Sequence, residues 1–164
     1  MPKLNSRYLR FGVLLGFLAV VVALAVIFGG SSDNTKPITD CGPYRNDRTL
    51  TINGAQFKTE APNNQAEFTK GLGGRPCILP NEAMIFPFKA PSQYAFWMKG
   101  MKFPIDVLWI NTNHQVVADF VNLQPSSYPK KFQNPATQPA QYVLELKANR
   151  SKDLRIGLGT IVQF

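Results

Sequence analysis

The sequence predicts a mainly β protein, a compact β-sandwich or barrel-like domain with one or two short helices, preceded by an N-terminal transmembrane helix. Two observations lead to this prediction. Residues 11–28 contain no charged or polar side chain. After residue 48, short β-prone runs alternate with Pro and Gly, a pattern typical of sandwiches and barrels.

Residues 11–28 are predicted to form the transmembrane helix. Backbone amides in hydrocarbon must hydrogen-bond to one another, which favours a helix, and at about 1.5 Å per residue this run nearly spans a core of about 30 Å. Three basic residues precede the run, whereas the next one after it is Lys36. The positive-inside rule therefore predicts that residues 1–10 are a cytoplasmic basic flank and that the chain beyond residue 35 is extracytoplasmic. A cleaved signal peptide is the alternative, because small residues at Gly29-Gly30-Ser31 permit cleavage.

The rest of the chain is predicted to be a tether and one domain. Residues 29–48 are rich in Ser, Asp, Asn, Gly and Pro and are expected to be flexible. Residues 49–164 have the usual length of a single domain. From residue 41 onward there are fourteen Lys and Arg against eight Asp and Glu, so this part carries about +6. Beside a membrane, such a surface attracts anionic lipid or anionic polymers, or it simply keeps the domain soluble. The positive residues are scattered, which argues against a nucleic-acid partner.

The cysteines allow two interpretations. Cys41 and Cys77 both lie in the predicted extracytoplasmic part, where an oxidising compartment permits a disulfide. Two free thiols are the alternative. Two Cys and one His are too few for a dedicated zinc site, so no metal centre is predicted, and no motif indicates a cofactor.

The strands follow from hydrophobic runs bounded by turn residues. Asn53-Gly54 lies between two β-prone runs, which is the strongest short-range signal for a hairpin. A polar loop at residues 111–115 predicts a second hairpin. The predicted strands cover residues 50–52, 55–57, 83–88, 94–99, 105–110, 116–121, 141–146 and 160–164.

Two short helices and one long loop complete the predicted domain. Residues 64–72 can form a helix, with Asn64 as N-cap and Gly71 as the C-terminal stop. Residues 151–155 can form one helical turn capped by Ser151. Residues 122–140 contain several prolines and are predicted to be an irregular loop.

Five motifs occur in order over the last two thirds of the chain. They are Gly71-Leu72 followed by Arg75, Ala83-Met84-Ile85-Phe86-Pro87-Phe88, Phe96-Trp97-Met98-Lys99 with Phe103-Pro104-Ile105-Asp106, Tyr142-Val143-Leu144-Glu145-Leu146, and Gly157 to Val162. In this order they resemble domain of unknown function family 192, from bacteria and archaea, over residues of about 50–164. The resemblance implies a compact β-rich sandwich and no established activity. The chain departs from the family pattern at Gly73, Ala83, Gly100-Met101 and Thr160.

The central motif supplies the best candidate site. Period-two alternation places Trp97 and Lys99 on one face of a strand, with Phe96 and Met98 on the other. If the strands at 94–99 and 105–110 pair around the intervening turn, Lys99 lies near Asp106. An ammonium beside a carboxylate and an indole can hold a sugar or a carboxylate ligand, or the pair is a structural salt bridge.

Two further charged residues, Arg75 and Glu145, allow both a functional and a structural interpretation. Arg75 binds an anion or fixes the loop that follows the helix. Glu145 lies within an apolar strand, where it either faces solvent or is buried against a basic residue such as Arg75 or Lys99.

The known catalytic motifs are missing, since no Gly-x-Ser-x-Gly, His-Glu-x-x-His or P-loop pattern occurs. We therefore expect a single-pass membrane protein whose extracytoplasmic domain binds a polysaccharide, another anionic envelope component or an envelope protein, with Trp97, Lys99, Asp106 and Arg75 as the candidate site. An accessory subunit of an envelope complex, which holds its partner through exposed aromatics and the loop at 122–140, is one alternative. A carboxylate-dependent hydrolase of envelope polymers is the other.

Overall fold

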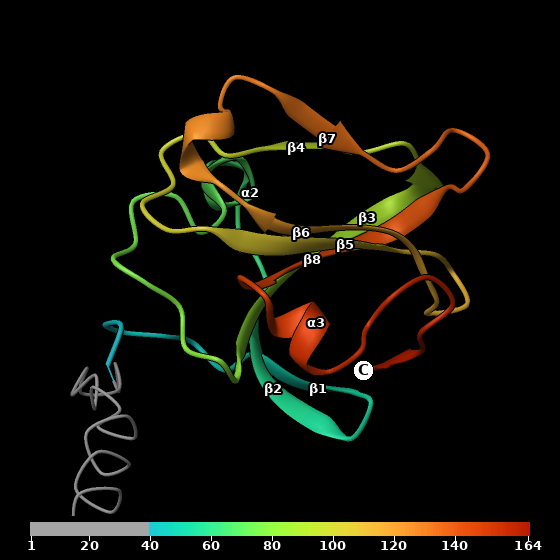
Figure 1. Cartoon of the computed structure of the whole chain (residues 1–164), viewed down its shortest axis with the longest axis horizontal. Coiled ribbons are helices and arrows are strands. Elements are labelled where there is room, and N and C mark those ends of the chain that lie inside the picture. The colour runs from blue at the N-terminus through green and yellow to red at the C-terminus, as the bar shows by residue number, and fades with distance from the viewer. Residues whose placement is uncertain (1–39) are drawn as a thin grey trace, which may run out of the picture. The chain divides into compact units, whose positions relative to one another are not determined.

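The computed structural model describes residues 40–164 (Figure 1). The predicted helix at 11–28, its basic flank and most of the predicted tether lie outside the described residues. Between residues 40 and 164, no helix has the length and apolar character needed to cross a membrane.

The domain is built on one curled, mainly antiparallel sheet of seven strands that forms a half-barrel. Its strand order is β6-β5-β8-β3-β2-β1-β9, and β2 and β3 are the parallel pair. A bridge between Gln115 and Ile161 brings the two edges of the sheet together at one end. The strands are β1 (Arg48–Ile52), β2 (Ala55–Glu60), β3 (Glu82–Ser92), β5 (Ile105–Ile110), β6 (Val116–Leu123), β8 (Ala140–Lys147) and β9 (Val162–Gln163). The mainly β prediction is confirmed.

The predicted hairpin at Asn53-Gly54 joins β1 to β2. Asn53 has φ 47° and Gly54 has φ 80°, so both turn residues adopt the left-handed conformation that a two-residue hairpin with the correct twist requires. The turn pairs Leu50 with Phe57 and Ile52 with Ala55. The hairpin prediction is therefore confirmed in both position and turn chemistry.

Both faces of the sheet are covered, which explains why every residue of β5 is buried. Alternation sends Leu108 and Ile110 into a core on the inner face, with residues of β1, β2 and β9. Val107 and Trp109 point to the outer face, where a second core forms beneath an outer layer. The sheet therefore has two apolar clusters, and the second one borders the candidate site.

The outer layer is a two-stranded ribbon of β4 (Ala95–Trp97) and β7 (Lys131–Gln133), seen above the main sheet in Figure 1. The indole Nε1 of Trp109 donates a hydrogen bond of 2.7 Å to the Tyr94 carbonyl oxygen, which ties this ribbon to the sheet. The sequence predicted that residues 122–140 form an irregular loop. The region instead contains β7 and a 3-10 turn, η1 (Pro125–Ser127). β7 has three residues, too few for a recognisable alternation.

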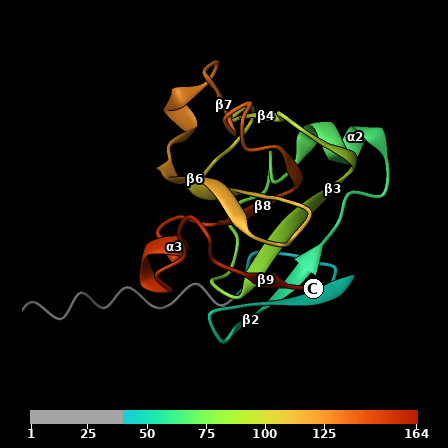
Figure 2. The same cartoon turned by 90° about the vertical axis from the view of Figure 1, so that its right-hand side faces the viewer.

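The parallel pairing of β2 and β3 forces the chain between them to cross over the sheet, and this crossover carries α2 (Gln65–Lys70). The helix begins at the predicted cap, where the Asn64 side chain accepts a hydrogen bond of 2.9 Å from the Glu67 backbone N–H. It ends at Gly71. Figure 2 shows α2 beside the outer ribbon.

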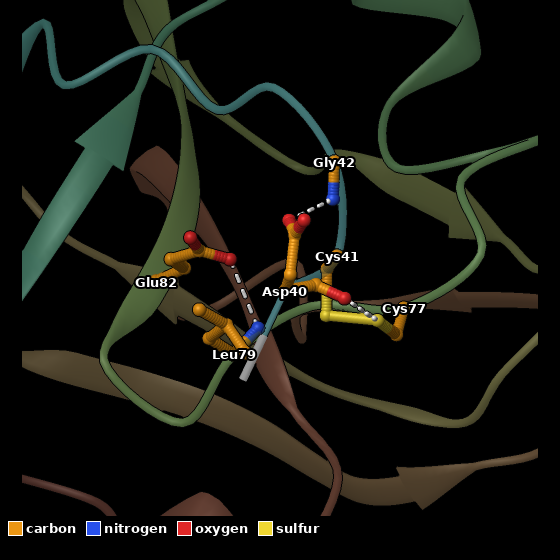
Figure 3. Close-up of a disulfide and its surroundings, with 6 residues drawn as sticks. All are labelled: Asp40, Cys41, Gly42, Cys77, Leu79 and Glu82. Carbon is orange, nitrogen blue, oxygen red and sulfur yellow. Dashed lines mark hydrogen bonds between the residues drawn. A yellow bond between two sulfur atoms is a disulfide. The ribbon is translucent and has the colours of Figure 1, made fainter. Parts of the chain in front are cut away.

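The stretch from residue 40 to residue 48, which the sequence places in the tether, is fastened to the domain. Cys41 and Cys77 form a disulfide, so the N-terminal stretch is joined to the end of the crossover (Figure 3). The Tyr44 hydroxyl donates to the Ala83 carbonyl oxygen, and the Arg45 backbone N–H donates to Glu60. Burial raises the pKa of Tyr44, consistent with a phenol that stays protonated in this contact.

The second helix, α3 (Arg150–Asp153), is the predicted short turn near the C-terminus, but Ser151 does not cap it. Asn149 occupies the N-cap with φ 66°, and Ser151 is buried inside the helix. The prediction was wrong because the helix begins one residue earlier, at Arg150, and the Asp106 carboxylate accepts a hydrogen bond of 2.7 Å from the Ser151 N–H in the first turn.

Candidate functional site

A buried carboxylate, Glu145, lies at the centre of the candidate site. Glu145 is on β8 and shares the outer face of the sheet with Val143, while Leu144 and Leu146 fill the inner core. Its side chain therefore points beneath the outer layer, and the residue is 4% exposed. The crossover reaches it there, and the Leu72 backbone N–H donates to Glu145 Oε2 at 3.3 Å.

Glu145 has few partners for a buried acid. Its Oε1 forms no hydrogen bond and its carboxylate forms no ion pair with any residue of 40–164. The only fully enclosed unpaired side-chain polar atom in this part of the chain is Ser151 Oγ, so Glu145 Oε1 retains contact with open space. Burial raises the pKa of Glu145 to about 7, opposed by the Leu72 hydrogen bond and by the positive charge of Arg75.

Glu145 lines a pocket of about 220 Å³ between α2 and the outer ribbon. The walls are aromatic and come from α2, β3 and β4. The rings of Phe88 and Tyr94 stack with their centroids 3.4 Å apart, and Phe96 packs edge-on against Phe86 at 4.9 Å. The aromatic residues lining the pocket are Phe68, Phe88, Tyr94, Phe96 and Trp97. The pocket therefore combines aromatic walls with one carboxylate, that of Glu145.

Trp97 and Lys99 also line this pocket, so the structure brings together two of the residues predicted from the sequence. The predicted alternation is confirmed, because Trp97 and Lys99 are exposed whereas Met98 is buried. Lys99 Nζ lies 5.4 Å from the centroid of the Trp97 ring, within range of a cation–π contact. Lys70 joins them from the last turn of α2.

A shallow groove of about 700 Å³ adjoins the pocket. The pocket and the groove share Thr69, Lys70 and Lys99 as lining residues. Two lysines therefore border both the aromatic pocket and the more open groove.

Gly71 sets the distance between the crossover and the carboxylate. It has φ 52°, a left-handed conformation that glycine tolerates best. A Cβ at this position would lie 3.2 Å from Glu145 Oε2 and 3.3 Å from Oε1, which is tight. A residue with a side chain here would therefore crowd the Glu145 carboxylate.

Asp106 does not belong to this site, and its predicted proximity to Lys99 is wrong. β4 pairs with β7 and not with β5, and Asp106 is fully buried on the other face of the sheet. Its Oδ1 accepts hydrogen bonds from the Asn122 and Asn149 backbone N–H groups at 2.8 and 2.9 Å, and its Oδ2 accepts the hydrogen bond from the Ser151 N–H. Asp106 therefore holds the ends of β6 and β8 and the start of α3 in place.

Arg75 has a structural partner. Its guanidinium forms an ion pair with Glu60, which is 1% exposed, and lies 5.3 Å from the centroid of the Tyr44 ring. Arg75 lines a smaller neighbouring pocket with Lys70 and Gly71 instead of the aromatic one. Its position fits the interpretation that it fixes the loop after α2.

The sequence did not decide whether the Glu145 side chain faces solvent or is buried. One signal could have identified it, namely a lone charge in the strand Tyr142–Leu146, whose odd positions share a face with other apolar residues. No cluster of three or more His, Cys, Asp or Glu that could hold a metal ion occurs within residues 40–164.

Comparisons with known proteins identify the family of the chain. Residues 48–164 match domain of unknown function family 192, described as Uncharacterized ACR. A crystal structure of a protein of unknown function from Novosphingobium aromaticivorans DSM 12444 is 28% identical, with a TM-score of 0.63 over 71% of this chain and 84% of that one. A putative transcription regulator from Sinorhizobium meliloti 1021 has the same fold at 24% identity, with a TM-score of 0.64 over 74% of this chain and 97% of that one. No curated protein matches the chain. Because the family match spans well over half of its length, the chain belongs to domain of unknown function family 192.

Proposed function

We propose that the protein is a membrane-anchored binding module whose domain lies outside the cytoplasm and takes one unit of a polysaccharide or another anionic envelope ligand into the aromatic pocket. The observation that carries this proposal is the pocket itself, in which Trp97, Lys99 and the buried Glu145 face the same space. The anchor and the topology rest on the apolar run at 11–28 and its basic flank.

The size of the pocket favours one unit of a longer ligand. Pockets that enclose a whole drug-sized ligand usually measure about 300–1,000 Å³, and this one measures about 220 Å³. The adjoining groove provides room for the neighbouring unit of the ligand. Aromatic faces can pack against the apolar faces of a sugar ring, while a few polar groups fix its orientation. The lysines and the net charge of about +6 favour a ligand with negative charge.

Binding is favoured over hydrolysis by the number of carboxylates. A glycosidase of the usual kind needs two carboxyl groups about 5–9.5 Å apart across the scissile bond. Glu145 is the only Asp or Glu among the described residues that line the pocket, since Asp106 faces the other side of the sheet.

A hydrolase is the second candidate because of one property of Glu145. A carboxyl group with a pKa of about 7 is suited to general acid–base work near neutral pH. Turnover of a labelled envelope polymer, abolished by Glu145→Gln, would favour this candidate over a binding module. An accessory role in an envelope complex is the third interpretation, in which Tyr128, at 44% exposure in the 122–140 region, contacts the partner with Trp97.

The proposal is tested by titrating the full-length protein with envelope saccharides by calorimetry. Trp97→Ala and Lys99→Ala should each weaken binding at least about tenfold, because each removes a wall or a charge from the pocket. Lys147→Ala is the matched control, since this exposed lysine at the end of β8 lines no described pocket. Equal affinities for all three variants would place binding elsewhere. Protease protection in intact cells tests the topology, and a domain protected in the cytoplasm would contradict the envelope ligand.

A further inference from the structure

We propose that the unit bound in the pocket is an amino sugar whose free ammonium pairs with Glu145, and whose anionic substituent remains at the lysine-lined opening. This inference names the ligand class of the proposed function and rests on it. The contacts of Glu145 and the positions of Lys70 and Lys99 carry the argument.

Glu145 has the properties of a site for a cation. Glu145 lines the pocket and is 4% exposed, its Oε1 forms no hydrogen bond with any residue of 40–164, and its Oε2 has one long hydrogen bond from Leu72. Buried carboxylates are usually paired with a charge or with several donors, because an unpaired buried charge is costly. A ligand ammonium supplies up to three donors and the opposite charge.

No basic residue within 40–164 forms an ion pair with Glu145. The guanidinium of Arg75 is paired with Glu60. Lys99 is directed over the Trp97 ring. Lys70 is directed toward Gly74, where its Nζ lies 3.9 Å from the position that a Cβ would have. None of the three forms an ion pair with Glu145, so the carboxylate is available to a ligand.

The aromatic walls discriminate between a cation and a neutral polar group. An ammonium is attracted by the faces of aromatic rings, whereas a hydroxyl is not attracted in this way. Phe68, Phe88, Tyr94, Phe96 and Trp97 line the same pocket as Glu145. Carboxylate and rings together therefore favour a positively charged group on the enclosed part of the ligand.

The border between the pocket and the groove favours a negatively charged group. Lys70 and Lys99 line both the pocket and the groove, and they present two positive charges to the part of the ligand that stays outside. A ligand with a second positive charge there would be repelled, and an anionic group would be attracted. The two preferences together describe a sugar unit with one free amine and one anionic substituent.

Four monosaccharide probes separate the two contributions. Glucosamine 6-phosphate carries the amine and the phosphate, glucosamine carries only the amine, glucose 6-phosphate only the phosphate, and N-acetylglucosamine 6-phosphate has the amine blocked. Titrated into the full-length protein, glucosamine 6-phosphate should bind at least about tenfold more tightly than each of the other three, since charge-assisted hydrogen bonds differ from neutral ones by this order.

Two variants assign the contributions to residues. Glu145→Gln keeps the volume and hydrogen-bonding capacity but loses the charge, so glucosamine 6-phosphate should fall to the affinity of glucose 6-phosphate. Lys99→Ala should weaken the binding of the three phosphate probes about equally and leave the preference for the amine. Intrinsic fluorescence melting checks that each variant is folded, and Lys147→Ala is again the control.

The outcomes distinguish the two proposals. If glucose 6-phosphate binds as tightly as glucosamine 6-phosphate, and Glu145→Gln changes neither, the amine assignment is wrong while saccharide binding stands. If neither these probes nor longer envelope saccharides bind, the proposed function fails together with the inference.

Discussion

Replacing Glu145 with Gln should change how the stability of the domain depends on pH. In the native protein, burial raises the pKa of this carboxyl from an ordinary 4.5 to about 7. Between these two values the folded chain holds a proton that the unfolded chain releases. The contribution of Glu145 to the free energy of unfolding therefore falls as pH rises from about 4.5 through about 7 and is level above that range.

The magnitude follows from the two pKa values. At about 1.4 kcal/mol per pH unit, the interval corresponds to about 3 kcal/mol of stability that is present in acid and lost by about pH 8. Glutamine does not titrate, and its side-chain oxygen can still accept the hydrogen bond from Leu72. The stability of the variant relative to wild type should therefore rise by about 3 kcal/mol between about pH 4.5 and pH 8.

The assay is urea unfolding of the full-length protein, followed by tryptophan fluorescence at several pH values. Trp97 and Trp109 are the only two tryptophans of the chain, and both lie in the domain, so the signal reports on the domain alone. The pKa values of Asp47 and Glu67 are lowered by hydrogen bonds that the backbone N–H groups of Ala61 and Asn63 donate to them, and the titration of these two groups cancels between wild type and variant. A difference between wild type and variant that is the same at both ends of the pH range would refute the reasoning.

Three other substitutions test the frame around the pocket, each by the same urea titration. Gly71→Ala should destabilise by about 1–3 kcal/mol, because it places a Cβ against the Glu145 carboxylate at an unfavourable φ; unchanged stability would show that the crossover shifts freely. Replacing Cys41 and Cys77 with Ser should cost about 3–4 kcal/mol, the chain-entropy value for a sequence separation of 36 residues, and a loss below about 1 kcal/mol would contradict that account. Asp106→Asn should destabilise by about 2–4 kcal/mol, because an amide cannot accept all three backbone hydrogen bonds, yet it should leave saccharide affinity unchanged; weaker binding by this variant would place Asp106 in the site after all.

Local features of the fold were predictable from the sequence because short-range physics decides them. Asn53-Gly54 specifies its hairpin through the backbone conformation of two residues, and Asn64 specifies the start of α2 through one side-chain hydrogen bond. The alternation of Phe96 to Lys99 is likewise a property of a single strand.

Pairing between distant segments was not predictable in the same way. The assumption that β4 pairs with the next strand failed, because its partner is β7, a short strand within a proline-rich stretch much later in the chain. The predicted proximity of Lys99 and Asp106 depended on that pairing and was wrong for the same reason. The environment of Glu145 depends on Leu72, 73 positions earlier in the chain, so its burial follows from the crossover and not from its own strand.

The disulfide decides where a mechanical load enters the domain. A pull on the chain ahead of residue 40 reaches Cys41 first, and the covalent bridge passes it to Cys77 at the end of the crossover. The bridge thereby keeps this load off the contacts of Tyr44 and Arg45 and off β1, which follows them in the chain. In a reducing medium the same tension would fall on those contacts directly, so the domain should withstand less force once the two sulfurs are separated.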